Sequence, residues 1–203
     1  MKIKGRDLSR AERDRLIGEI GMLASPRPPE TRICGTHCNE ICPACGKRDC
    51  TCACTRDCRH IARALSSEPD RFPLEPGIAS LVFALKCLGA FDPCWSCEGH
   101  NDVSGKLFRL PQVWFYCDST VQVRLLSDAL SDLSGGQRVR ADWRVSVTYS
   151  DDDNPKTTFA LLPFLSDSRE TSLIDLQKDV DTIAREIGPR ILAASKKLLG
   201  QLG

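Results

Sequence analysis

The hydrophobic positions fall into helical and strand-like periods through most of the chain after residue 77. Ile78 to Leu88 is almost continuously apolar and is followed by a glycine, which predicts a buried helix. Val113 to Cys117 combines β-branched and aromatic residues and predicts a buried strand. Residues 119–133 begin with two hydroxyl residues that can cap a helix, and their apolar positions then recur at helical spacing.

The C-terminal part of the chain continues this mixed pattern. Trp143 to Ser150 alternates apolar and polar residues, and Thr157 to Leu165 returns after an acidic turn as its hairpin partner. A closing helix is expected from Ser172, broken at Gly188 and Pro189 before a last helical stretch. These elements predict an α+β fold with a small, mainly antiparallel sheet and helices on one face.

The N-terminal part of the chain predicts a single helix followed by a proline-rich segment. Ser9 and Glu12 have the spacing of a capping box before an apolar stripe that ends at Leu23. The prolines of residues 25–30 then stop the helix. The sequence therefore predicts three parts: a helix and Pro-rich linker at residues 1–30, a cysteine-rich module at 31–60, and an α+β domain at 70–203.

Composition and charge narrow the class of protein. The hydrophobic fraction of 41% fits a globular fold, and a net charge of +1 gives no whole-protein attraction to nucleic acid or membrane. The first sixteen residues are too charged for a secretory signal, and no later apolar run has the ~18 residues of a membrane span. We expect a cytoplasmic protein with no membrane partner.

Eight of the twelve cysteines crowd into one segment, and this crowding predicts metal binding. A reducing compartment favours metal ligation of such cysteines over disulfides. Zinc is the default metal, and eight thiolates suffice for about two tetrahedral sites in a zinc finger-like module. The segment has few large apolar residues, so metal binding must supply its folding free energy. The expected ligands are Cys34, Cys38, Cys42, Cys45, Cys50, Cys52, Cys54 and Cys58, with His37 and His60 as possible substitutes.

An iron–sulfur cluster is the alternative for this segment. Cys38, Cys42 and Cys45 have the C-x₃-C-x₂-C spacing, in the stretch CNEICPAC. This stretch resembles the cluster motif of radical S-adenosylmethionine enzymes, in which three cysteines hold a [4Fe–4S] centre. The resemblance covers eight of 203 residues, and the alternating β/α sequence of that family's barrel does not follow. Cysteine ligation of iron and of zinc overlaps in spacing, so both metals stay open.

A second constellation lies in the stretch PCWSCEGHND. Cys94, Cys97 and His100 could ligate a metal, with Cys117 as a fourth ligand if its strand pairs with this segment. With an open position, the site would be of the catalytic type, Glu98 would be the general base, and Asp102 would orient His100. The simpler interpretation is that the cysteines on either side of Trp95 only pack.

The sequence thus predicts an intracellular zinc-binding protein whose module supports contacts to a protein or a nucleic acid. One alternative is a metal-dependent or cysteine-dependent enzyme with its site at Cys97, Glu98 and His100. A second alternative is an iron–sulfur protein. The sequence names no small-molecule substrate.

Overall fold

The computed structural model describes residues 7–25, 66, 68, 70–72, 74–148, 157–165 and 171–202. The predicted cysteine-rich module at residues 31–60 and the acidic turn before the last strand lie outside these ranges. The predicted zinc ligands from Cys34 to Cys58 therefore remain predictions from the sequence.

The described residues form an α+β fold, as the sequence predicts. A four-stranded antiparallel sheet has the order β1-β4-β6-β5, and β2 pairs with β3 in a separate two-stranded hairpin. The helices in the described ranges are α1 (Arg10–Ala24), α3 (Pro76–Cys87), α4 (Thr120–Gly135) and α5 (Leu173–Leu202). The strands are β1 (Asp92–Cys97), β2 (His100–Asn101), β3 (Leu107–Arg109), β4 (Gln112–Tyr116), β5 (Asp142–Thr148) and β6 (Thr158–Phe164).

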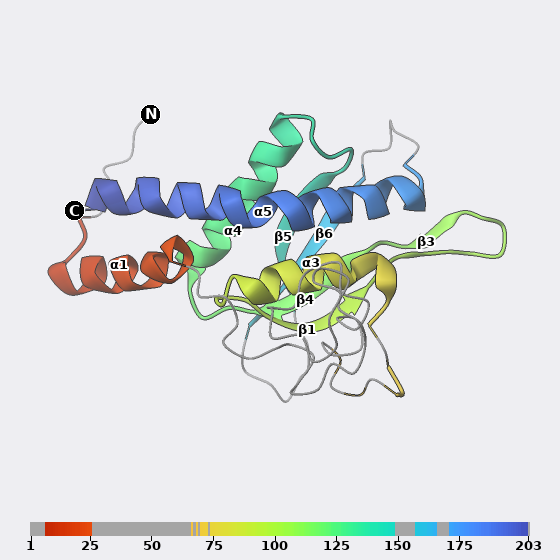
Figure 1. Cartoon of the computed structure of the whole chain (residues 1–203), viewed down its shortest axis with the longest axis horizontal. Helices are drawn as coiled ribbons and strands as arrows, with labels where there is room; N and C mark the ends of the chain where they lie inside the picture. Colours follow the sequence, from red (N-terminus) through yellow and green to blue (C-terminus); the bar gives the residue numbers. More distant parts are fainter. Residues whose placement is uncertain are drawn as a thin grey trace, which may run out of the picture.

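One face of the sheet supplies the core. Val113 and Phe115 of β4 and Leu161 of β6 are fully buried and belong to one apolar cluster with the helices. Trp114, between the two buried β4 residues, points to the opposite face, because successive strand residues alternate. Helix α3 packs on β1 and β4, and α4 packs on β5. Helix α5 lies beside both α1 and α3, and the β2–β3 hairpin extends beyond its end (Figure 1).

Helix α1 is part of the same core. Ile20 and Leu23 are buried in the cluster, and α1 packs against α5 and α4. The predicted capping box is confirmed: the Glu12 backbone N–H donates to the Ser9 hydroxyl, and the Ser9 N–H donates to the Glu12 carboxylate. The core therefore draws on both sides of the cysteine-rich segment in the sequence.

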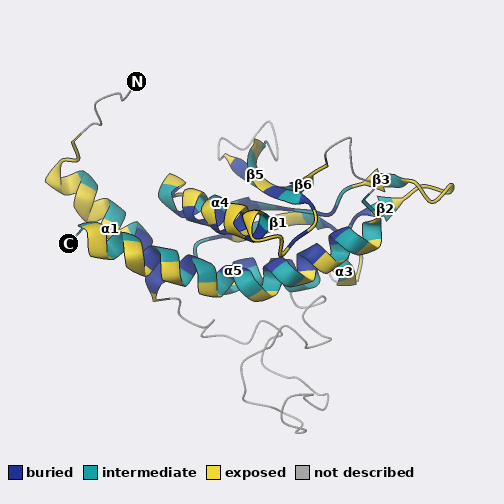
Figure 2. Cartoon of the chain, turned by 90° about the horizontal axis from the view of Figure 1, so that it is seen from above, coloured by how far each residue is buried: buried dark blue, intermediate teal, exposed yellow. Residues whose placement is uncertain are grey.

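The predicted break in the last helix is wrong. Helix α5 runs without interruption from Leu173 to Leu202, with Pro189 inside it. Pro189 costs a backbone hydrogen bond and about 3 kcal/mol or more. Ile187 and Ile191 on either side of it are fully buried, and each such side chain contributes about 1.5–3 kcal/mol. Buried positions continue along the length of α5 (Figure 2), so packing outweighs the local cost.

No helix in the described ranges combines the length and hydropathy needed to cross a bilayer. The segment after α3 becomes the edge strand β1, which has a bulge at Cys94 between Pro93 and Trp95. The chain then turns at Gly99 into the β2–β3 hairpin. This edge of the sheet, beside the first turn of α3, carries the candidate site.

Candidate metal site

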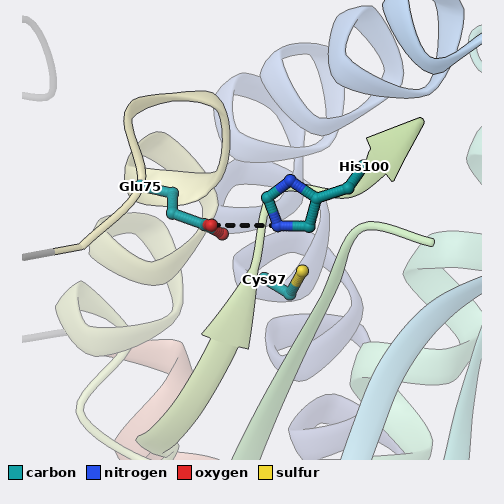
Figure 3. A group of neighbouring side chains, drawn as sticks. All are labelled: Glu75, Cys97 and His100. Atoms are coloured by element: carbon teal, nitrogen blue, oxygen red, sulfur yellow. Dashed lines mark ion pairs between the residues drawn. The ribbon is translucent and has the colours of Figure 1, made fainter. Parts of the chain in front are cut away.

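Three side chains from three elements meet at the edge of the sheet. Glu75 is the N-cap residue of α3, Cys97 is the last residue of β1, and His100 is the first residue of β2. Each offers one ligand atom, and these three atoms lie within 4.8 Å of one another (Figure 3). The structure thus brings together two predicted site residues, Cys97 and His100, and adds Glu75.

Two carboxylates hold this arrangement, because each accepts a hydrogen bond from a backbone N–H of the other segment. The Glu98 N–H donates to Glu75 Oε2 at 2.7 Å, and the Gly77 N–H donates to Glu98 Oε2 at 2.7 Å. Pro76 has no N–H, so Gly77 is the first donor inside the helix, and the Glu98 carboxylate caps it from the neighbouring turn. The start of α3 and the end of β1 are therefore fixed to each other.

Two glycines make this close approach possible. A Cβ on Gly77 would lie 2.8 Å from Glu98 Oε2 and 3.2 Å from Glu98 Cβ. Gly99 has a φ of +86°, and a Cβ there would lie 2.7 Å from Leu173 Cδ1. A left-handed backbone without space for a side chain requires glycine. The C-E-G-H sequence therefore forms a tight turn that places Cys97 and His100 on the same side.

The three side chains differ in exposure. Cys97 is 2% exposed, whereas the His100 and Glu75 side chains are 44% and 35% exposed. His100 Nε2 lies 3.0 Å from Glu75 Oε1. The site therefore has a buried sulfur at its base and a solvent-accessible imidazole and carboxylate above it.

This donor set suits a transition metal. Thiolate sulfur, imidazole nitrogen and carboxylate oxygen are the three donor types that zinc takes from proteins. Zinc bonds of about 2.0–2.3 Å place tetrahedral ligand atoms roughly 3.3–3.8 Å apart. The observed limit of 4.8 Å is close to that spacing, so side-chain adjustment of about 1 Å would complete it.

The other two predicted ligands do not join this group. Tyr116, next to Cys117, pairs with Asp92, whereas Cys97 pairs with Gln112 at the other end of the same ladder. The Cys117 thiol donates to the Ser119 carbonyl at 3.4 Å, as a packed thiol does. Burial raises the pKa of this thiol, and the nearby carboxylates of Asp118, Glu19 and Asp92 add to the rise.

Cys94 also lies apart. It occupies the bulge of β1 and is exposed. Partial burial of its sulfur raises the pKa of the thiol, although the residue as a whole faces solvent. A protonated thiol is a poor ligand and a poor nucleophile, because both roles need the thiolate.

The two carboxylates to which the sequence analysis gave roles, Glu98 and Asp102, make other contacts in the structure. Glu98 caps α3, so its carboxylate is directed to Gly77 and not to a reacting group. The Asp102 carboxylate accepts hydrogen bonds from the Ser104 hydroxyl and from the Lys106 and Ser104 N–H groups in the hairpin turn, and these bonds, the hydroxyl's first, lower its pKa. Glu75 is the partner of His100 in its place.

Sequence reasoning missed Glu75 because it lies just before the first element predicted in the α+β domain, 22 positions before Cys97. One signal was present: an acidic residue directly before Pro-Gly at a helix start occupies a fixed N-cap position. That signal places Glu75 on α3, but it does not say what α3 packs against. The pairing of α3 with β1 supplies that information.

No known protein family, curated protein or solved structure matches this chain.

Proposed function

We propose that this chain is a metal-binding protein and that Glu75, Cys97 and His100 bind a zinc ion. The observation that carries the proposal is the convergence of three different donor atoms within 4.8 Å of one another. The buried sulfur favours a metal over a packing role, because the two neighbours of Cys97 in this space are polar. Mixed nitrogen, oxygen and sulfur donors favour zinc among the divalent metals of the cell.

The site is pre-organised without a metal. The Glu75 carboxylate holds the Glu98 N–H at 2.7 Å and His100 at 3.0 Å, so it occupies one orientation. Ligands fixed by such contacts bind metal more tightly, since less conformational freedom is lost on binding. Gly77 and Gly99 support the proposal by keeping the three backbones close.

In this proposal the cysteine-rich segment binds further zinc ions. Its eight cysteines supply ligands for about two ions, and the folded module supports contacts to a protein or nucleic acid. An iron–sulfur cluster in that segment is the alternative, and metal analysis distinguishes the two. The Glu75–Cys97–His100 site is a separate proposal because none of its ligands comes from the segment.

A cysteine-dependent enzyme is the second candidate. The ion pair between Glu75 and His100 would orient an imidazole beside the Cys97 sulfur, as in a nucleophile–base–orienter arrangement. In that arrangement the base uses one nitrogen for the nucleophile and the other for the orienter. Zinc protection separates the candidates: a metal ligand is shielded from iodoacetamide by zinc, whereas a free nucleophile is alkylated with or without zinc.

The direct test is zinc content per chain after equilibration with buffered zinc. We expect Cys97→Ala to bind one ion fewer than the wild type. Cys94→Ala is the matched control, because it removes a thiol from the same strand three residues away and should bind as much zinc as the wild type. Equal zinc in Cys97→Ala and the wild type would contradict the proposal.

A further inference from the structure

We infer that a metal held by Glu75, Cys97 and His100 keeps its fourth position open and takes there a neutral oxygen or nitrogen donor. Water fills the position at rest, and a small molecule with a hydroxyl or carbonyl group displaces it. This inference rests on the proposed function and adds the class of ligand. It makes the site one of the catalytic kind, with three protein ligands and an exchangeable fourth.

The first argument is the number of donors. Within the part of the chain that the structure describes, the metal-ligating group contains three residues. The adjacent residue Glu98 uses its carboxylate to accept the Gly77 N–H at 2.7 Å and so caps a helix. Asp102 is held in its own turn by Ser104 and Lys106. Tetrahedral zinc needs four ligands, so the described residues leave one position for a ligand from solution.

The second argument is exposure. The sulfur of Cys97 lies at the closed base of the site, with 2% of the residue exposed. The His100 and Glu75 side chains are 44% and 35% exposed. The position opposite the sulfur therefore faces solvent. A structural zinc site has all four positions filled by protein ligands, whereas the exposed side of this site leaves room for a ligand from solution.

The third argument is charge. A thiolate and a carboxylate together carry −2, which balances the +2 of zinc, while His100 is a neutral ligand. An anionic fourth ligand would leave a net negative centre beside the further carboxylate of Glu98, which the hydrogen bond to Gly77 holds in place. Arg109 pairs with His100 across the hairpin, but it is exposed, and its attraction for anions is screened by salt. Neutral donors are therefore preferred to anions.

The test uses full-length protein in which cobalt(II) replaces zinc. Cobalt in other sites contributes equally to the wild type and Cys97→Ala, so their difference spectrum reports this site. We expect imidazole, a neutral nitrogen donor, to shift the visible bands of the difference spectrum with saturation. Sodium azide should need at least a tenfold higher concentration. Cobalt content measured after each titration ensures that the metal stays bound.

Each outcome is decisive. A difference spectrum that imidazole leaves unchanged means that a fourth protein ligand closes the site, which overturns the inference while metal binding stands. Azide acting at lower concentration than imidazole overturns the preference for neutral donors. The absence of any difference spectrum instead contradicts the proposed metal site. Glu75→Gln, which keeps an acceptor for the Glu98 N–H, serves as a second reference variant if Cys97→Ala fails to fold.

Discussion

Two places in this fold use carboxylates to fix a helix to the sheet, and they differ in how completely the carboxylates are satisfied. Asp179 of α5 is 3% exposed and accepts the Arg140 and Ala141 N–H groups at 2.9 Å and the Trp143 indole N–H at 3.1 Å. At the other place, Glu75 accepts one backbone N–H and faces the His100 imidazole. It is also half exposed, beside a buried sulfur.

The difference separates a structural anchor from a candidate chemical site. The oxygens of Asp179 are saturated by N–H donors that cannot leave, so a cation cannot compete for them. Among the described residues, the recorded partner of Glu75 Oε1 is the His100 imidazole, and imidazole and carboxylate can both turn to a metal. An acidic residue at a helix–sheet contact is therefore a ligand candidate only where its hydrogen bonds leave an oxygen available.

The largest expected effect comes from breaking the saturated anchor. Asp179→Ala leaves the Arg140 N–H, the Ala141 N–H and the Trp143 indole without their acceptor in a buried place. We expect a loss of about 3 kcal/mol in the free energy of unfolding. Urea titration followed by far-UV circular dichroism measures it. Asp128→Ala is the control: its 3.6 Å pair with Arg124 is exposed, so the loss should stay below about 1 kcal/mol.

A loss for Asp179→Ala no larger than that for Asp128→Ala would show that the buried carboxylate does not anchor β5. The contrast between Asp179 as a structural anchor and Glu75 as a candidate ligand would then not hold.

The next largest effect is expected at the candidate site, from a substitution of Gly77 at the contact between α3 and the end of β1. A Cβ at Gly77 would approach Glu98 Oε2 to 2.8 Å and Gln177 Nε2 to 3.0 Å. We expect Gly77→Ala to cost about 1–2 kcal/mol of stability and to weaken zinc binding by about 10-fold or more, since the turn holding Cys97 shifts. Thermal unfolding and competition with a zinc chelator measure the two effects.

Gly18→Ala is the matched control, because Gly18 lies in helix α1 with no atom within 4 Å of an added Cβ. It should stabilise the protein by about 0.5–1 kcal/mol and leave zinc affinity unchanged. Equal zinc affinity in Gly77→Ala and the wild type would mean that the cap between Glu98 and α3 does not position the ligands.

The smallest effect concerns Glu186, a partly buried surface carboxylate on the same helix as Asp179. Glu186 binds Arg190 at 2.8 Å and also binds Arg138, and these hydrogen bonds hold the pKa of Glu186 below its usual range. A depressed folded-state pKa means that the pairs stabilise the fold above the ordinary glutamate pKa, and that this contribution disappears as the pH falls through the folded-state value. Surface pairs of this kind contribute about 0–1 kcal/mol.

Unfolding free energies of Glu186→Gln and the wild type, measured from neutral to acidic pH, test this expectation. The wild type should be slightly more stable at neutral pH, and the two should converge in acid. High salt should narrow the gap, because it screens exposed charges. A gap that widens in acid would contradict the assigned sign.

The sequence predicted those parts of the fold that local pattern determines. The β5–β6 pairing follows from the alternation in β5 and the mostly apolar segment that returns after an acidic turn, and α4 follows from its helical spacing and hydroxyl cap. The continuity of α5 could not be predicted, because it depends on what Ile187 and Ile191 pack against. Local propensity at Pro189 gives the opposite answer.

The candidate site was predicted only in part, because the sequence pattern indicates local proximity but not packing between distant segments. Cys97 and His100 are three residues apart, so their proximity is a local property of one turn. Glu75 reaches them through the packing of α3 on β1, which no spacing in the sequence encodes. The separation of Cys117 from Cys97 likewise follows from the register of β1 and β4, and a pattern of apolar residues does not specify register between two distant strands.

The most direct test of the central claim is anomalous diffraction at the zinc edge from crystals of the full chain grown with zinc. The account predicts an anomalous peak between Glu75 Oε1, Cys97 Sγ and His100 Nε2, at about 2.0–2.3 Å from each atom. Zinc peaks elsewhere in the chain with none at these three residues, at saturating zinc, would contradict it.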